Sequence, residues 1–213
     1  MLVLASASPR RRELLAQAGY TFQVHPAHVN EDPFAGEEPV PYVTRLAREK
    51  AAAVFRELSA APPAPGNPGA NSPGQGEQRR PLAVLGADTT VTIDNQILAK
   101  PENAADAARM LRLLSGRSHR VITGVALVTA EAAEVAAEVT AVRFLSLSDQ
   151  EIAAYVASGE PMDKAGAYAI QGRAARWIPR IEGCYFNVMG LPLALVSHLI
   201  DSRFPASRFR SGS

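Results

Sequence analysis

Asp88 is the first residue of this chain whose position points to chemistry. It follows the apolar run at 82–85 and then Gly86-Ala87, so we expect it at the carboxyl end of a buried strand. Open α/β sheets bind their ligands at those ends. A carboxylate there can hold a divalent cation or accept a proton from water. The alternative is a turn aspartate that precedes the hairpin predicted over 91–98.

Two lysines are placed to act beside this aspartate. Lys50 falls on the apolar stripe of a helix predicted over about 41–58. An ammonium group on such a stripe either extends to solvent or meets an anion. Lys100 follows the predicted hairpin and can return beside Asp88. We therefore expect both lysines at the same site as the aspartate.

The segment Ser6-Ala-Ser-Pro-Arg-Arg11 runs from a short apolar strand into the start of a helix. Ser8 can cap that helix, and Pro9 suits its first turn. Free amide groups, the serine hydroxyls of Ser6 and Ser8, and the positive end of the helix dipole form a place for phosphate. A bound anion would also offset the cost of Arg10 and Arg11 in the first turn. The alternative is an ordinary capped helix with solvated arginines.

Other residues narrow the chemistry further. Polar groups recur among small residues at 163–172, beginning with Asp163. Cys184 has no evident base partner, and the four histidines lack the spacing of a zinc site. The cations outnumber the carboxylates beside them, which suits a polyphosphate with a metal ion and catalysis by positioning and charge neutralisation. These cations are Arg10, Arg11, Lys50, Lys100 and Lys164.

Composition sets the background for this chemistry. The chain has 213 residues, 47% hydrophobic and 20% charged, with a formal net charge of +1. We expect neither nucleic acid nor a membrane as a partner, because there is no strong overall charge and no apolar run of about 20 residues. The N-terminal arginines follow the first apolar stretch, which is the reverse of a secretory signal. Together with the single cysteine, this predicts a cytoplasmic protein.

Strand and helix patterns alternate along the chain, which predicts an α/β fold with a mixed, twisted sheet flanked by helices. One predicted helix begins after Ser8, and the others cover 41–58, 102–114, 148–157 and 190–200, with Ser148 and Glu151 at the spacing of a capping box. The predicted strands are 2–5, 22–29, 82–85, 91–98 as a hairpin that turns at Asp94-Asn95, 120–129, 135–145, 168–170 and 177–181. Residues 60–80 are rich in Pro and Gly and are predicted to be a disordered surface loop. We expect one catalytic domain over 1–203 and a flexible tail at 204–213.

Several ordered motifs resemble one known family. They are LASASPRRRELL (4–15), Glu31, YVTRLAREKA (42–51), LGADTTV (85–91), KP (100–101), MLRLLSG with SH (110–119), GEPMDKAGAYAIQG (159–172) and IEG, Y and NVMGLPL (181–193). Together they resemble the Maf family of nucleoside triphosphate pyrophosphatases. The resemblance implies two lobes around a central cleft, a homodimer, and cleavage between the α and β phosphates.

The resemblance also implies roles for individual residues. Asp88 matches the proposed proton acceptor or metal-site carboxylate, and whether it is base, ligand or both stays open. The positions that line the phosphate and metal region in the family match Ser6, Ser8, Arg11, Glu31, Lys50, Lys100 and Asp163. We predict Glu31 and Asp88 as ligands of Mg²⁺ or Mn²⁺, with Lys50, Lys100 and Arg11 neutralising the leaving pyrophosphate. Relatives often have an acidic pair where this chain reads Asn30-Glu31.

Three positions indicate the branch of the family. Arg10, Thr89 and Gln171 match the branch that looks like dTTP/UTP pyrophosphatases, whereas the branch resembling 7-methyl-GTP pyrophosphatases has Trp, Gln and Glu there. A glutamine can offer a donor and an acceptor to a pyrimidine edge. We therefore predict hydrolysis of dTTP, UTP and modified pyrimidine analogues. The alternatives are a nucleotide-binding regulator of septum formation and an enzyme that removes non-standard purines such as ITP.

Overall fold

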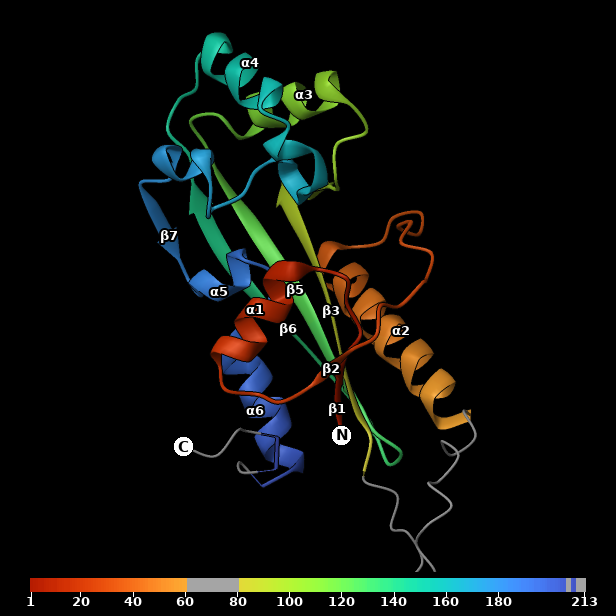
Figure 1. The fold of residues 1–213 in the computed structure, drawn as a ribbon. Coiled ribbons are helices and arrows are strands. Elements are labelled where there is room, and N and C mark those ends of the chain that lie inside the picture. The colour runs from red at the N-terminus through yellow and green to blue at the C-terminus, as the bar shows by residue number, and fades with distance from the viewer. Residues whose placement is uncertain (61–80, 206–207, 210–213) are drawn as a thin grey trace, which may run out of the picture.

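A mixed sheet forms the centre of the molecule in a computed structural model that describes residues 1–60, 81–205 and 208–209. Its strands are β1 (Leu2–Leu4), β2 (Gln23–Val24), β3 (Ala83–Ile93), β4 (Gln96–Leu98), β5 (Ser118–Val128), β6 (Ala133–Arg143) and β7 (Arg180–Glu182). The order is β2-β1-β3-β5-β6-β7, with β4 paired to β3 (Figure 1). Strand β1 is parallel to β2 and β3, and the remaining pairs are antiparallel. The predicted α/β class with a mixed sheet is confirmed.

Helices flank this sheet, as predicted. They are α1 (Pro9–Gln17), α2 (Pro39–Ala60), α3 (Ala104–Leu114), α4 (Asp149–Ala157), α5 (Tyr185–Val188) and α6 (Leu193–Arg203), with short 3₁₀ segments η1 (Glu160–Asp163), η2 (Ala165–Ala167) and η3 (Arg173–Trp177). Helix α2 runs alongside the long strands, α3 and α4 lie together beyond one end, and α6 lies near the other (Figure 1). Within the described ranges, no helix is long and apolar enough to cross a membrane.

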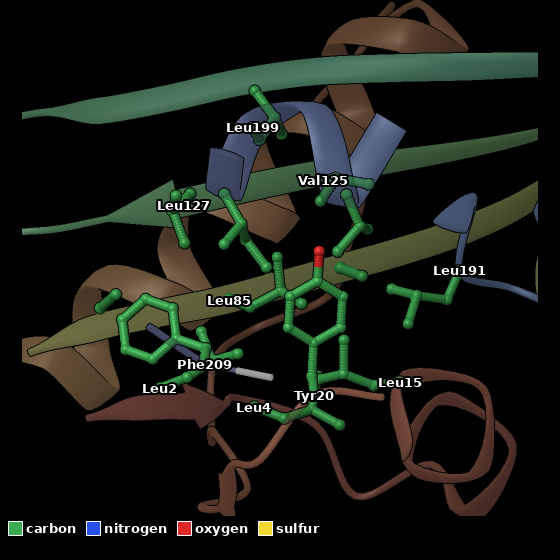
Figure 2. Packing of buried hydrophobic residues seen from close by; sticks show 14 of the residues in the cluster. Leu2, Leu4, Leu15, Tyr20, Leu85, Val125, Leu127, Leu191, Leu199 and Phe209 are labelled. Carbon is green, nitrogen blue, oxygen red and sulfur yellow. The ribbon is translucent and has the colours of Figure 1, made fainter. Parts of the chain in front are cut away.

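Two large hydrophobic clusters divide the molecule into two lobes. One joins β1, α1 and α6 around residues such as Leu4, Leu15 and Leu199 (Figure 2). The other joins α3 and α4 to the far half of the sheet around Phe144 and Trp177. Because the long strands β3 and β5 contribute to both clusters, they connect the lobes and set their spacing.

The segment after residue 203 differs from the predicted flexible tail. Phe204 and Phe209 are buried in the first cluster, with their rings 4.8 Å apart and the Phe209 carbonyl accepting a hydrogen bond from the amide of Thr21. The two aromatic rings have apolar surface to bury, which holds this part of the segment on the core. The predicted disordered loop at 60–80 lies, apart from residue 60, outside the described residues.

The helix caps predicted from the sequence are confirmed. Ser8 accepts a hydrogen bond from the Arg11 amide at the start of α1, and Ser148 with Glu151 forms the predicted capping box of α4. The predicted hairpin turn at Asp94-Asn95 is also confirmed, because both residues have positive φ angles (51° and 60°).

Four strand predictions were wrong. The strand predicted over 177–181 is displaced to β7, because Trp177 belongs to the 3₁₀ segment η3. Strand β3 continues past residue 85 as far as Ile93, because β-branched residues 89–93 extend it along β5. The strand predicted over 22–29 is reduced to the two residues of β2. No strand forms at 168–170, which follows the 3₁₀ turns of η2 and two left-handed residues, Gly166 and Ala167.

Helix α2 approaches the sheet with its backbone at two glycines. A methyl group on Gly86 would overlap the carbonyl oxygen of Ala47, and one on Gly124 would overlap that of Val43. These glycines are needed for the close approach and not for an unusual backbone angle. Gly124 pairs directly with Asp88 in the sheet, so the contact lies beside the predicted catalytic residue.

Candidate active site

A cavity of about 790 Å³ lies where the start of α1, the loop before α2, helix α2 and strand β3 meet. It brings together all the predicted site residues except Gln171. The set comprises Ser6, Ser8, Arg10, Arg11, Glu31, Lys50, Asp88, Thr89, Lys100 and Asp163. Stretches around residues 10, 50 and 90 thus converge on one pocket, as a single site built from these residues requires.

Asp88 reaches this pocket from the middle of a strand. The prediction that it ends a strand was wrong, because β3 continues through it to Ile93. The alternative of a turn aspartate is excluded for the same reason. The Asp88 side chain points to the face covered by α2, where it is 8% exposed and meets Lys50. A carboxylate in that position is shielded from bulk water and needs a partner.

Lys50 is that partner and also holds Glu31. Its ammonium nitrogen lies 2.6 Å from Oδ1 of Asp88 and 2.6 Å from Oε1 of Glu31. Lys50 is buried, whereas about half of the Glu31 side chain is exposed. The alternative in which Lys50 extends to solvent is therefore excluded, and one cation joins two carboxylates at the wall of the cavity.

The surrounding charges keep Glu31 ionised. Partial burial is the largest single influence and favours the neutral acid, but it is outweighed by the Lys50 hydrogen bond and by the charges of Lys50, Lys100 and Arg11. The pKa of Glu31 is therefore lowered. Tyr42 shows the opposite shift, because burial and the charges of Asp88 and Glu31 raise its pKa to about 12. Tyr42 consequently stays protonated at neutral pH and donates to the Glu31 carbonyl oxygen at 2.9 Å.

The carboxylates fit one kind of metal ion. Glu31 and Asp88 meet the same ammonium group, so they can share a cation. In the described part of the chain, no cluster of three or more His, Cys, Asp or Glu side chains could hold a metal. A pair of carboxylates suits Mg²⁺ or Mn²⁺, which complete their coordination with water and phosphate oxygens, and does not suit a structural zinc site.

Arg11 differs from its predicted role at the phosphates. Its guanidinium donates to the carbonyl oxygens of Gly190 and Ala87, both at 2.8 Å, and to Oγ1 of Thr89 at 2.9 Å. Burial lowers its pKa, which the charges of Asp88 and Glu31 oppose. Arg11 therefore fastens α1 to β3 and to the loop before α6. That loop and β3 both belong to the cavity wall.

The remaining polar groups of the predicted site also line the pocket. Arg10 is half-buried and lines the cavity, as does the exposed Lys100. Asp163 pairs with the neighbouring Lys164, which also lines the cavity. Ser6 is buried, and its hydroxyl accepts a hydrogen bond from the Ser8 amide at 3.2 Å. The pocket therefore contains cations from four separate segments, which are Arg10 and Arg11, Lys50, Lys100, and Lys164.

Comparison with known proteins identifies the family of this chain. A family model described as "Maf-like protein" matches residues 1–203. The chain belongs to the Maf family. Among its Maf relatives, a "dTTP/UTP pyrophosphatase" of Koribacter versatilis (strain Ellin345) is 49% identical over 199 residues, covering 93% of this chain and 92% of the relative. Proteins of the same description from Citrifermentans bemidjiense and Symbiobacterium thermophilum are 51% and 50% identical, covering 92% and 90% of this chain and 91% and 88% of the relatives.

The three positions that indicate the Maf branch are not equivalent in space. Arg10 and Thr89 line the cavity, but Oγ1 of Thr89 already accepts from Arg11 and lies 2.9 Å from Oγ1 of Thr123. Gln171 is exposed and is not part of the cavity wall. Its role in base recognition therefore stays a prediction, and Arg10 is the member of the set best placed to meet a nucleotide.

Sequence reasoning missed one residue of this Maf site that it could have found. Tyr42 lines the cavity and lies on the stripe of α2 that also carries Leu46 and Lys50, at spacings of four residues. Once Lys50 was assigned to the site, this spacing placed Tyr42 on the same side of the helix. Its hydrogen bond to Glu31 could not be read from the sequence, because the loop between them has no regular pattern.

Proposed function

We propose that this protein hydrolyses dTTP and UTP to the nucleoside monophosphate and pyrophosphate. The observation that carries the proposal is the buried Lys50, held between Asp88 and Glu31 at a pocket with further cations. Relatives that are about half identical over most of their length are described as dTTP/UTP pyrophosphatases, which supports this choice of substrates.

The proposed reaction uses the pocket as follows. A water molecule attacks the α phosphorus and transfers a proton to Asp88, while the bond from the α phosphorus to the bridging oxygen breaks and pyrophosphate leaves. Lys50, Lys100 and Arg10 neutralise the negative charge that accumulates on the leaving group. Arg11 holds the main chain of β3 in place through Ala87, next to Asp88.

We propose Asp88 and Glu31 as the residues that hold Mg²⁺ or Mn²⁺. When bound, the ion supplies positive charge to the phosphate oxygens. The lowered pKa of Glu31 supports this assignment, because a metal ligand must be ionised at neutral pH. We propose that Asp88 acts as base, as ligand, or as both.

A nucleotide panel with purified protein tests the proposal. We expect dTTP and UTP to be the best substrates, with monophosphate and pyrophosphate as products, and activity to disappear with a chelator. A best rate with 7-methyl-GTP or ITP would overturn the specificity, and nucleoside diphosphate with phosphate as products would mean that a different bond is cut. Binding without any pyrophosphate release would favour the regulator of septum formation.

The Asp88→Asn variant tests the assignment of the site. The amide cannot accept the proton from water, so we expect turnover of UTP to fall by at least about a hundredfold. Retention of most of the wild-type rate would remove Asp88 from the catalytic role.

We also propose that the protein is a cytoplasmic homodimer. The support is the resemblance to the Maf family, a nucleotide substrate, and a single cysteine in the whole chain. Light scattering coupled to size exclusion measures the mass in solution, and a single species of about 23 kDa, close to the chain mass of 22.7 kDa, would contradict the dimer.

A further inference from the structure

Glu31 reaches the pocket from a segment that has no helix or strand to position it. Residues 25–38 connect β2 to α2 without regular secondary structure. Fixing the backbone of such a segment costs conformational entropy at every residue. The Glu31 side chain pairs with Lys50, but one ion pair does not fix the backbone of the loop, which needs further attachments.

Arg45 is the residue that fastens it. Its guanidinium donates one hydrogen bond to each carboxylate oxygen of Glu37, both at 2.6 Å. It also donates to the main-chain oxygen of Asp32 at 3.1 Å. The same group lies 4.0 Å from the centre of the Phe34 ring. One side chain on α2 thus contacts the loop at three positions directly after Glu31.

The Glu37 end of this contact is held by a further hydrogen bond and is shielded from solvent. Glu37 also accepts a hydrogen bond from the Phe34 amide at 3.0 Å, and only 8% of its side chain is exposed. The hydrogen bonds to Glu37 are the main reason that the pKa of Arg45 is raised. A two-bond pair between guanidinium and carboxylate fixes orientation as well as distance.

Tyr42 provides a second attachment of the loop, at a residue that precedes the positions contacted by Arg45. It donates to the main-chain oxygen of Glu31 itself. Tyr42, Arg45 and Lys50 therefore hold the Glu31 segment from one helix, and of the three only Arg45 lies outside the cavity wall. We therefore expect Arg45 to contact neither the substrate nor the metal.

We propose that Arg45 is a positioning residue for the metal ligand Glu31. It acts by holding the loop at Asp32 and Glu37, so that the Glu31 carboxylate is already in place when Mg²⁺ or Mn²⁺ arrives. This proposal rests on the proposed function, because it assumes that Glu31 is a ligand. Outer residues that orient a ligand affect metal affinity by about 10–100-fold when mutated.

Arg45→Lys tests the proposal, because lysine keeps the charge but cannot form the two-bond grip. Mn²⁺ binding is measured by electron paramagnetic resonance, with a UTP analogue that carries a methylene between the α and β phosphorus atoms. We expect the dissociation constant for Mn²⁺ to rise about tenfold. The kcat at saturating Mn²⁺ and the KM for UTP should stay within about twofold of wild type, which a general structural defect would not allow.

Arg48→Lys is the matched control. Arg48 lies on the same helix three residues later and is exposed, so we expect its Mn²⁺ affinity to equal that of wild type. Glu37→Gln should weaken Mn²⁺ binding as Arg45→Lys does, and combining the two should add little, because they break the same contact. If Arg45→Lys fails to fold, Tyr42→Phe tests the same attachment by removing one hydrogen bond, with a smaller shift in the same direction.

The outcomes separate this proposal from the proposed function. Mn²⁺ affinity in Arg45→Lys within twofold of wild type would overturn the positioning role alone. A wild-type protein that binds no Mn²⁺ and releases no pyrophosphate would overturn the proposed function. Equal weakening in Arg45→Lys and Arg48→Lys would show a general charge or stability effect and would also overturn the inference.

Discussion

The ammonium nitrogen of Lys50 lies 2.6 Å from Oδ1 of Asp88, and both side chains are buried. The two residues are 38 positions apart, on α2 and β3. Removing one member of a buried ion pair leaves the other charge without compensation, which costs more than the intact pair contributes. The pair therefore has a structural effect that can be measured separately from turnover.

Lys50→Met should lower the free energy of unfolding by about 3 kcal/mol, because it leaves the buried Asp88 carboxylate without its partner. Asp88→Asn should cost less, since Lys50 still pairs with Glu31. The double variant should be more stable than the sum of the two effects predicts. Urea denaturation measures all three variants. Arg48→Met, on the exposed side of α2, is the control and should change stability by no more than about 0.5 kcal/mol. Strict additivity would show that the two residues do not interact.

Gly124→Ala should move α2 away from Asp88. The new methyl group would overlap the carbonyl oxygen of Val43, so we expect a loss of about 2 kcal/mol in stability and a lower kcat with UTP. Asp88→Glu in the same chain should recover part of that rate, because the longer side chain spans the wider gap to Lys50. The control is Arg48→Ala, on the exposed side of α2, which should leave both stability and rate nearly unchanged. Equal rates in Gly124→Ala and wild type would contradict the idea that this close packing sets the geometry.

Arg10 and Arg11 are adjacent but should respond differently to mutation. Arg11→Lys loses hydrogen bonds to the carbonyl oxygens of Gly190 and Ala87, and each buried acceptor left unpaired costs about 1–3 kcal/mol. We expect a clear loss of stability. Arg10→Ala should leave the urea midpoint nearly unchanged and raise the KM for UTP, because Arg10 lines the pocket. The same loss of stability in both variants would contradict this division of roles.

Sequence patterns predicted the site because helix periodicity indicates which residues lie on the same face of a helix. Lys50 falls on the apolar stripe of α2, and burying an ammonium group demands an anion, so its pairing could be anticipated. The patterns were less informative about Asp88. Small residues before it looked like a strand end, whereas the β-branched residues after it continue the ladder with β5.

Contacts between segments that are distant in the chain could not be predicted from the sequence. Nothing in the residues around Arg11 indicates that its guanidinium will meet Gly190, 179 positions later. Likewise, residues 204–213 were predicted to be a flexible tail, yet Phe209 belongs to the first cluster together with Leu2. Such contacts depend on the path of the whole chain, which local propensity does not encode.

His119 provides a prediction for acid stability. It is 3% exposed, and burial lowers its pKa from 6.5 to about 3. The folded protein therefore keeps His119 neutral, while the unfolded chain takes up a proton below about pH 6.5. Stability should be complete above that pH and should fall by roughly 1.4 kcal/mol per unit as the pH decreases toward 3.

His119→Gln tests this contribution, since glutamine does not titrate and can still form a hydrogen bond to the Tyr168 hydroxyl, which lies 2.7 Å from Nε2 of His119. Urea unfolding between pH 4 and 8 should show a shallower decline in acid for His119→Gln than for wild type. His198→Gln is the matched control, because His198 is exposed on α6 and should leave the wild-type slope unchanged. Identical acid slopes in all three proteins would mean that His119 does not determine the acid sensitivity of the fold.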